Sequence, residues 1–163
     1  MTRRLVPLIL AGALVGATAL ATTAASADTP GVACQVSGTI KFQPPLAVTA
    51  ADVQYVLSLG TANCVTSGGA VAGTLAGSGS SGVKGLSCAG GDSQGSVTVT
   101  DANGAQVASA GFTASATGPL FIPNNGAYGT LVLAIDPTGC ATSGVASASF
   151  TGSLVFPTAF PSP

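Results

Sequence analysis

Residues 34–46 read CQVSGTIKFQPPL, and they predict a strand with one buried face. Before the prolines, the even positions are mainly apolar, among them Val36, Ile40 and Phe42, while the odd positions are polar. Such alternation is typical of a half-buried β-strand. We expect the strand to stop at Pro44–Pro45, because proline has no N–H to donate to a strand ladder. We therefore interpret this stretch as scaffold and not as a binding site.

A similar phrase occurs near the end of the chain, where residues 148–160 read ASFTGSLVFPTAF. It shares the alternation, a glycine and the proline stop. We interpret it as a second edge strand and as a candidate partner of the first. A functional surface is expected instead in the loop predicted at 117–129.

Period-two alternation also recurs between these phrases, for example at 53–60. One short helical turn is expected at 49–52, and Asn103-Gly104 predicts a hairpin between two alternating runs. Several short strands separated by turn residues are typical of an antiparallel sandwich or barrel. We predict an all-β fold, an antiparallel β-sandwich of immunoglobulin-like architecture. The remaining predicted strands are 70–76, 83–88, 95–100, 105–113, 130–135 and 145–156.

The first 27 residues have the layout of a secretory signal peptide. Arg3 and Arg4 precede an apolar stretch at 5–20, and Ala25-Ser26-Ala27 has the small-x-small pattern of a cleavage site. We therefore expect a secreted, extracellular protein without a membrane span after cleavage. The predicted organisation is a signal peptide (1–27), one β-sandwich domain (28–156) and a proline-rich, extended tail (157–163).

Four cysteines in an exported chain predict two disulfides. If 34–43 and 53–60 form a hairpin, Ile40 lies opposite Leu57 and Cys64 falls one residue out of register with Cys34. A β-bulge at Gly60 would close that gap. Cys34–Cys64 and Cys88–Cys140 are therefore favoured among three possible pairings. A four-cysteine zinc site is disfavoured because the cysteines are not closely spaced.

Composition excludes several chemistries. The chain has no histidine and no glutamate, which removes Ser-His-Asp catalysis and most zinc and copper sites. The mature part carries two lysines and five aspartates, a net charge of −3, so nucleic-acid binding is not expected. We predict a non-enzyme with no metal and no cofactor. Turn and cap chemistry is expected for Asp52, Asp92, Asp101 and Asp136.

The signal peptide, the four cysteines and the phrases SGTIKFQPPL (37–46) and FTGSLVFP (150–157) together resemble small secreted four-cysteine β proteins of actinobacteria, many of unknown function. In size, export, low charge and two-disulfide sandwich architecture the chain is also similar to apoproteins of the neocarzinostatin type. The cysteines of that group close short loops, whereas the spacings here are 30, 24 and 52. No binding residue is therefore carried over from it.

These observations favour a secreted protein that acts through its surface, by binding or by association with the cell envelope. The expected partner is an extracellular protein, a glycan or a second copy of the chain. The candidate binding residues are Phe121, Asn124, Asn125 and Tyr128. One alternative is a carrier of small molecules with an apolar cleft lined by Phe112, Phe121 and Tyr128. Another is an enzyme inhibitor that uses the loop predicted at 121–126.

Overall fold

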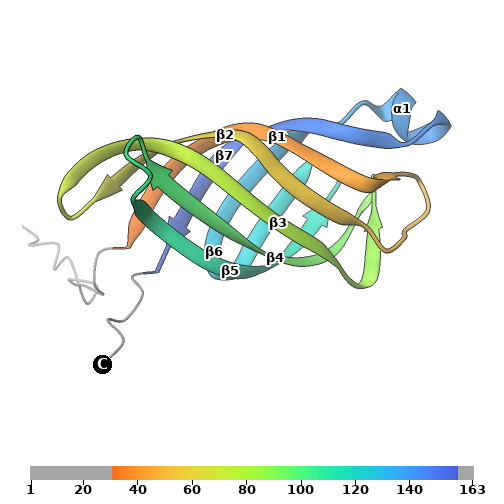
Figure 1. Cartoon of the computed structure of the whole chain (residues 1–163). Coiled ribbons are helices and arrows are strands. Elements are labelled where there is room, and N and C mark those ends of the chain that lie inside the picture. The colour runs from red at the N-terminus through yellow and green to blue at the C-terminus, as the bar shows by residue number, and fades with distance from the viewer. Residues whose placement is uncertain (1–30, 158–163) are drawn as a thin grey trace, which may run out of the picture.

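The computed structural model describes residues 31–157, which form a closed antiparallel β-barrel (Figure 1). Each strand pairs with the next along the chain, and the last strand returns to pair with the first. The expected signal peptide and residues 158–163 of the expected tail lie outside the described residues. The elements are β1 (Val32–Leu46), β2 (Gln54–Thr66), β3 (Gly69–Ser87), β4 (Gly90–Asp101), β5 (Gln106–Thr117), β6 (Leu120–Ala134), α1 (Pro137–Thr142) and β7 (Val145–Phe156).

The strand β6 folds back on itself. Its first half pairs with β5, from Leu120 to Gly126, and its second half pairs with β7, from Tyr128 to Ala134. The N–H of Leu133 donates to the carbonyl of Pro119 over 2.8 Å, so the two halves lie side by side. With β6 counted as two halves, the barrel wall has 8 antiparallel segments.

Closure of this sheet shows that the predicted β-sandwich, and with it the immunoglobulin-like architecture, was wrong. The strands β1 and β7 pair from Val32↔Phe156 to Lys41↔Ser147, so the two similar phrases are indeed partners. Neither of them is an edge strand, because β1 also pairs with β2 and β7 also pairs with β6. Sandwiches and barrels share the same local alternation and turn residues, and they differ only in whether the first and last strands meet.

Three further local predictions were wrong. The strand β1 does not stop at Pro44–Pro45 but continues to Leu46, which pairs with Val145 after an interruption of the ladder across the prolines. The segment predicted as a loop at 117–129 lies largely within β6, and 49–52 forms no helix. The helix in the described part of the chain is α1, where Asp136 caps the N-terminus by accepting from the N–H of Thr138 over 2.9 Å. Pro137 follows this cap, where a missing N–H costs nothing. No helix among residues 31–157 is long and apolar enough to cross a membrane.

The disulfides occur in the favoured pairs, Cys34–Cys64 and Cys88–Cys140, and they are compatible with an extracellular protein. Cys34 lies directly opposite Cys64 because β2 has one extra residue between the pairs Ser37↔Thr61 and Thr39↔Ser58. The expected Ile40↔Leu57 pair is present. The bulge therefore brings the first disulfide into register.

Leu59 lies in this bulge and has a positive φ of 53°. Its side chain is 86% exposed, so it gains little from packing. A non-glycine residue in the left-handed region costs about 1 kcal/mol or more, while glycine adopts it freely. We predict that Leu59→Gly leaves the free energy of unfolding unchanged or raises it by up to about 1 kcal/mol, measured by chemical denaturation.

Val56→Gly is the matched control, because Val56 is 52% exposed on the same strand and its φ is not positive. This control is expected to lose about 1 kcal/mol. An equal loss in both variants would contradict the assignment of strain to Leu59.

Candidate functional site

The barrel interior is filled by apolar side chains around four aromatic rings. Phe42, Tyr55, Phe121 and Phe112 form a chain of edge-to-face contacts with ring centroids 6.5, 6.0 and 6.0 Å apart. A barrel of about eight strands is just wide enough for its side chains to fill. Two voids of about 20 Å³ each lie among these side chains, one lined by residues such as Ile40 and Leu131 and the other by residues such as Phe42 and Leu46. Both are far smaller than the roughly 300 Å³ at which ligand pockets begin.

Glycines make room for two of these rings. Strand pairing places Tyr55, Gly79, Gly95, Phe112 and Gly126 in one row across β2 to β6. A Cβ atom on Gly79 would overlap the ring and hydroxyl of Tyr55, and one on Gly95 would lie 2.9 Å from Cζ of Phe112. The two rings therefore occupy the space that side chains at Gly79 and Gly95 would need.

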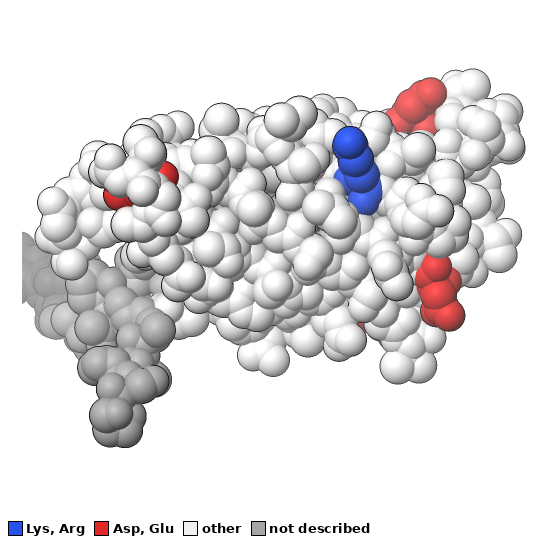
Figure 2. All heavy atoms as spheres, in the orientation of Figure 1, with Lys and Arg blue, Asp and Glu red and all other residues white. Residues whose placement is uncertain are grey.

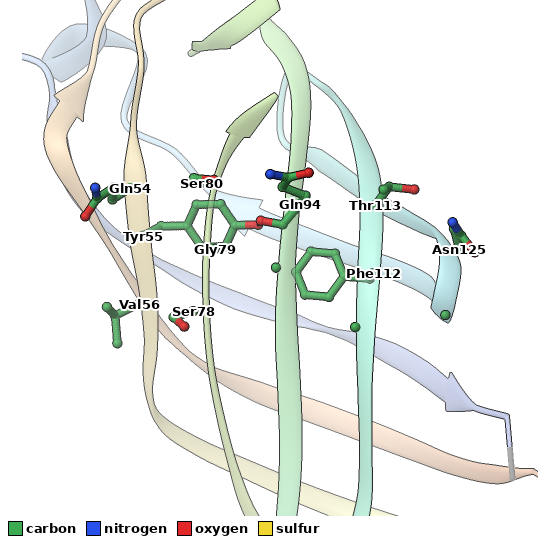
Figure 3. A pocket seen from close by; sticks show the side chains of 13 residues that line it. Gln54, Tyr55, Val56, Ser78, Gly79, Ser80, Gln94, Phe112, Thr113 and Asn125 are labelled. Carbon is green, nitrogen blue, oxygen red and sulfur yellow. The ribbon is translucent and has the colours of Figure 1, made fainter. Parts of the chain in front are cut away.

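An open groove of about 820 Å³ crosses the barrel wall along this row (Figure 3). One side of the groove is formed by the next row of side chains, which we call the polar row. Figure 3 shows these side chains aligned across successive strands. Inter-strand spacings of about 4.8 Å give this row a length of about 19 Å. Its members pair in the order Gln54↔Ser80↔Gln94↔Thr113↔Asn125.

The groove is polar but carries no charge. Its other side is formed by Val56, Ser78 and Gly111. Most polar side-chain groups in the groove are therefore the amides and hydroxyls of the polar row from Gln54 to Asn125. Figure 2 shows that charged side chains are few and scattered on one face of the molecule. Lys84 and Asp92 form an exposed ion pair with a 3.5 Å separation, and neither of them lines the groove. The groove therefore favours a ligand that hydrogen-bonds without being charged.

Tyr55 anchors the floor of the groove from inside the barrel. Its hydroxyl lies 3.2 Å from Oγ of Ser93 and 3.3 Å from the backbone oxygen of Gln94. Burial raises the pKa of Tyr55 to about 12, and the Ser93 hydrogen bond opposes this rise only in part. The phenol is therefore neutral at physiological pH, where it donates to β4 directly below the Gln94 side chain.

The structure brings only part of the predicted binding set to this site. Asn125 lines the groove, and Asn124 accepts a hydrogen bond of 3.0 Å from Thr113, which also lines it. Phe121 is buried in the core, whereas Tyr128 is 51% exposed on the outside of β6. Together with buried Phe112, these residues do not line one cleft, so the cleft expected for the carrier alternative is not formed by them. The segment 121–126, considered as an inhibitor loop, is part of the β6 ladder with β5.

Sequence reasoning missed the other members of the polar row. Gln54 and Gln94 occupy polar positions of alternating strands, so their exposure is readable from the sequence. Their alignment with Ser80 and Thr113 depends on the registers of three separate strand pairs. Local pattern does not supply those registers. Gly79 and Gly95 lie inside β3 and β4, where glycines mark bends or close approaches. Gly79, however, fell between two predicted strands and Gly95 began the strand predicted at 95–100, so this signal was not available.

Two of the four aspartates, Asp101 and Asp136, behave as expected. The carboxylate of Asp101 accepts from the N–H groups of Asn103 and Ala105, both over 2.8 Å, in the predicted hairpin turn between β4 and β5. Asp136 is the cap of α1, whereas Asp92 lies within β4 and not in a turn. Across residues 31–157, no three acidic or cysteine side chains gather as a metal-binding group would.

Comparisons with protein-family models, curated proteins and solved structures found no match for this chain. The resemblance to secreted actinobacterial proteins therefore stays a prediction.

The raised pKa of Tyr55 predicts a loss of stability at alkaline pH. The folded state keeps this proton up to a pKa of about 12, whereas the unfolded chain releases it near 10.0. The stabilisation is therefore complete below pH 10 and is lost as the pH rises towards 12. Between about pH 9 and pH 11, this difference lowers the free energy of unfolding by about 1.3 kcal/mol.

Urea denaturation at these two pH values measures the effect, with Tyr55→Phe as the comparison. The variant is expected to be about 1 kcal/mol less stable at pH 9, because Ser93 loses its buried partner. Its stability is expected to fall less steeply above pH 9. An alkaline loss of equal size in both proteins would show that Tyr55 is not the group responsible.

Proposed function

We propose that this chain is an extracellular binding protein whose groove holds a neutral, hydroxyl-rich chain, most simply a glycan. The observation that carries the proposal is the polar row from Gln54 to Asn125, which the strand registers align across the groove. This interpretation narrows the surface-binding role expected from composition to one ligand class and one place on the barrel.

The chemistry of the row supports a glycan. An amide side chain offers both a donor and an acceptor, and a hydroxyl offers the same pair on one atom. Gln54, Gln94 and Asn125 alternate with Ser80 and Thr113, so every strand contributes both functions. Sugar hydroxyls are themselves donors and acceptors and carry no charge. An ionic ligand would lose hydration in the groove without meeting an opposite charge.

The shape of the groove supports an extended ligand. Its floor is the backbone of the row whose side chains point into the barrel, and Gly111 on its side has open space where a side chain would be, so a ligand can approach the backbone closely. Its length of about 19 Å exceeds what one small molecule needs and suits several consecutive units of a polymer. A secreted protein with such a groove would bind glycans of the cell envelope or of its surroundings.

Calorimetric titration with neutral linear oligosaccharides of increasing length tests the proposal. Affinity is expected to rise with chain length until the groove is filled. Gln94→Leu is expected to weaken binding by about tenfold, because a hydrogen bond worth about 1.4 kcal/mol is lost. The Gln94 backbone oxygen that faces Tyr55 is retained in this variant.

Gln35→Leu is the matched control, because Gln35 is exposed on β1 and does not line the groove. It is expected to bind like the wild type. The proposal would be overturned if no neutral glycan gave a measurable heat of binding. It would also be overturned if Gln35→Leu and Gln94→Leu weakened binding equally.

A further inference from the structure

Four large apolar side chains are exposed on the outer surface of one strand, β6. We call this set the β6 face. The exposed fractions are 39% for Leu120, 38% for Ile122, 51% for Tyr128 and 46% for Val132. The alternate residues Phe121, Leu131 and Leu133 point into the core, so the exposure follows from the pleat of the strand.

The fold of β6 gathers these side chains into one patch. The hydrogen bond from Leu133 to Pro119 sets a register in which Leu120 lies beside Val132. In the same register Ile122 lies beside Thr130, and Tyr128 lies beside Asn124. Ile122 therefore adjoins Leu120 along the strand, and Tyr128 adjoins Ile122 only diagonally. Contiguous apolar patches rimmed by polar residues mark interaction sites, whereas single exposed apolar residues do not.

The surroundings of the β6 face are small and uncharged. On one side, Leu120 and Ile122 pair with Thr117 and Ser115 of β5. On the other side, Val132 pairs with Thr151, and Tyr128 pairs with Val155, of β7. The three strands β5, β6 and β7 contain no Asp, Glu, Lys or Arg.

We propose that the β6 face binds the same face of a second copy of this chain around a two-fold axis. In an isologous contact the same surface of each copy faces the other, so a charged side chain on the face would lie close to a like charge of the second copy. The wall formed by β5, β6 and β7 has no charged side chain, and self-association therefore meets no repulsion between like charges. A charged partner would find no complementary group here. The small Ser and Thr side chains of β5 and β7 leave room for the larger side chains of the opposite copy.

The area of the surface formed by β5, β6 and β7 limits the strength of the contact between two copies. Four strand segments are about 19 Å wide, and seven residues extend for about 23 Å, which gives a flat area of roughly 440 Å². Two such faces bury less than the roughly 1,200 Å² of a stable interface. The dimer is therefore reversible and depends on protein concentration.

Sedimentation velocity of the disulfide-bonded protein across a wide concentration range tests the proposal. The wild type is expected to shift from monomer to dimer as its concentration rises. Val132→Asp places like charges across the two-fold axis, and Ile122→Ser removes apolar area. Each variant is expected to weaken the dimer by about tenfold or more.

Val83→Asp is the matched control, since Val83 is fully exposed on β3, outside the wall formed by β5, β6 and β7. It adds the same charge and is expected to dimerise like the wild type, as is Gln94→Leu in the groove. Circular dichroism verifies that each variant is folded. The proposal is overturned by a wild type that stays monomeric throughout. It is also overturned if both β6 variants dimerise normally, or if Val83→Asp disrupts the dimer equally.

Discussion

The packing of the Tyr55 and Phe112 rings over Gly79 and Gly95 is the contact on which the rest of this structure depends. The four residues are neighbours in one row of the sheet, and each ring occupies the place that a side chain at the adjacent glycine would take. Phe121 touches both rings edge to face, and this links the row to β6. The two rings fill the barrel interior on the inner side of this row, and the groove lies on its outer side.

This packing decides where a ligand can bind. The interior voids measure only about 20 Å³ each, whereas the groove outside the same glycine row measures about 820 Å³. The barrel therefore offers its surface and not its lumen. That surface is nearly free of charge, which favours contacts made by hydrogen bonds and apolar packing. The polar groove and the apolar β6 face are two consequences of the same composition.

Much of the local structure was predictable because it depends on short-range constraints. Alternation placed Val36, Ile40 and Phe42 in the core, and the positions of Cys34 and Cys64 required a bulge that the structure places at Leu59 and Gly60. The pairing of the two similar segments, 34–46 and 148–160, was also predictable from their similarity.

Closure of the barrel could not be predicted from the sequence, because no local pattern shows whether the first and last strands of the sheet pair. The segment 117–129 looked like a loop because Pro123, Asn124, Asn125 and Gly126 are turn residues. They do reverse the chain, but the reversal lies inside a ladder that also pairs with β5. Only Asn125 of the predicted binding residues lines the groove, because the groove is assembled by four strand registers that no single segment encodes.

The free energies of unfolding of Gly79→Ala and Gly111→Ala test the central packing claim most directly. Both glycines line the groove, but a methyl group added at Gly79 would overlap Tyr55 and the backbone of Gln94, whereas one added at Gly111 would have its nearest neighbour at 3.7 Å. We predict that Gly79→Ala loses about 2–3 kcal/mol through overpacking, while Gly111→Ala is neutral or gains about 0.5 kcal/mol. Equal stabilities for the two variants would contradict the account.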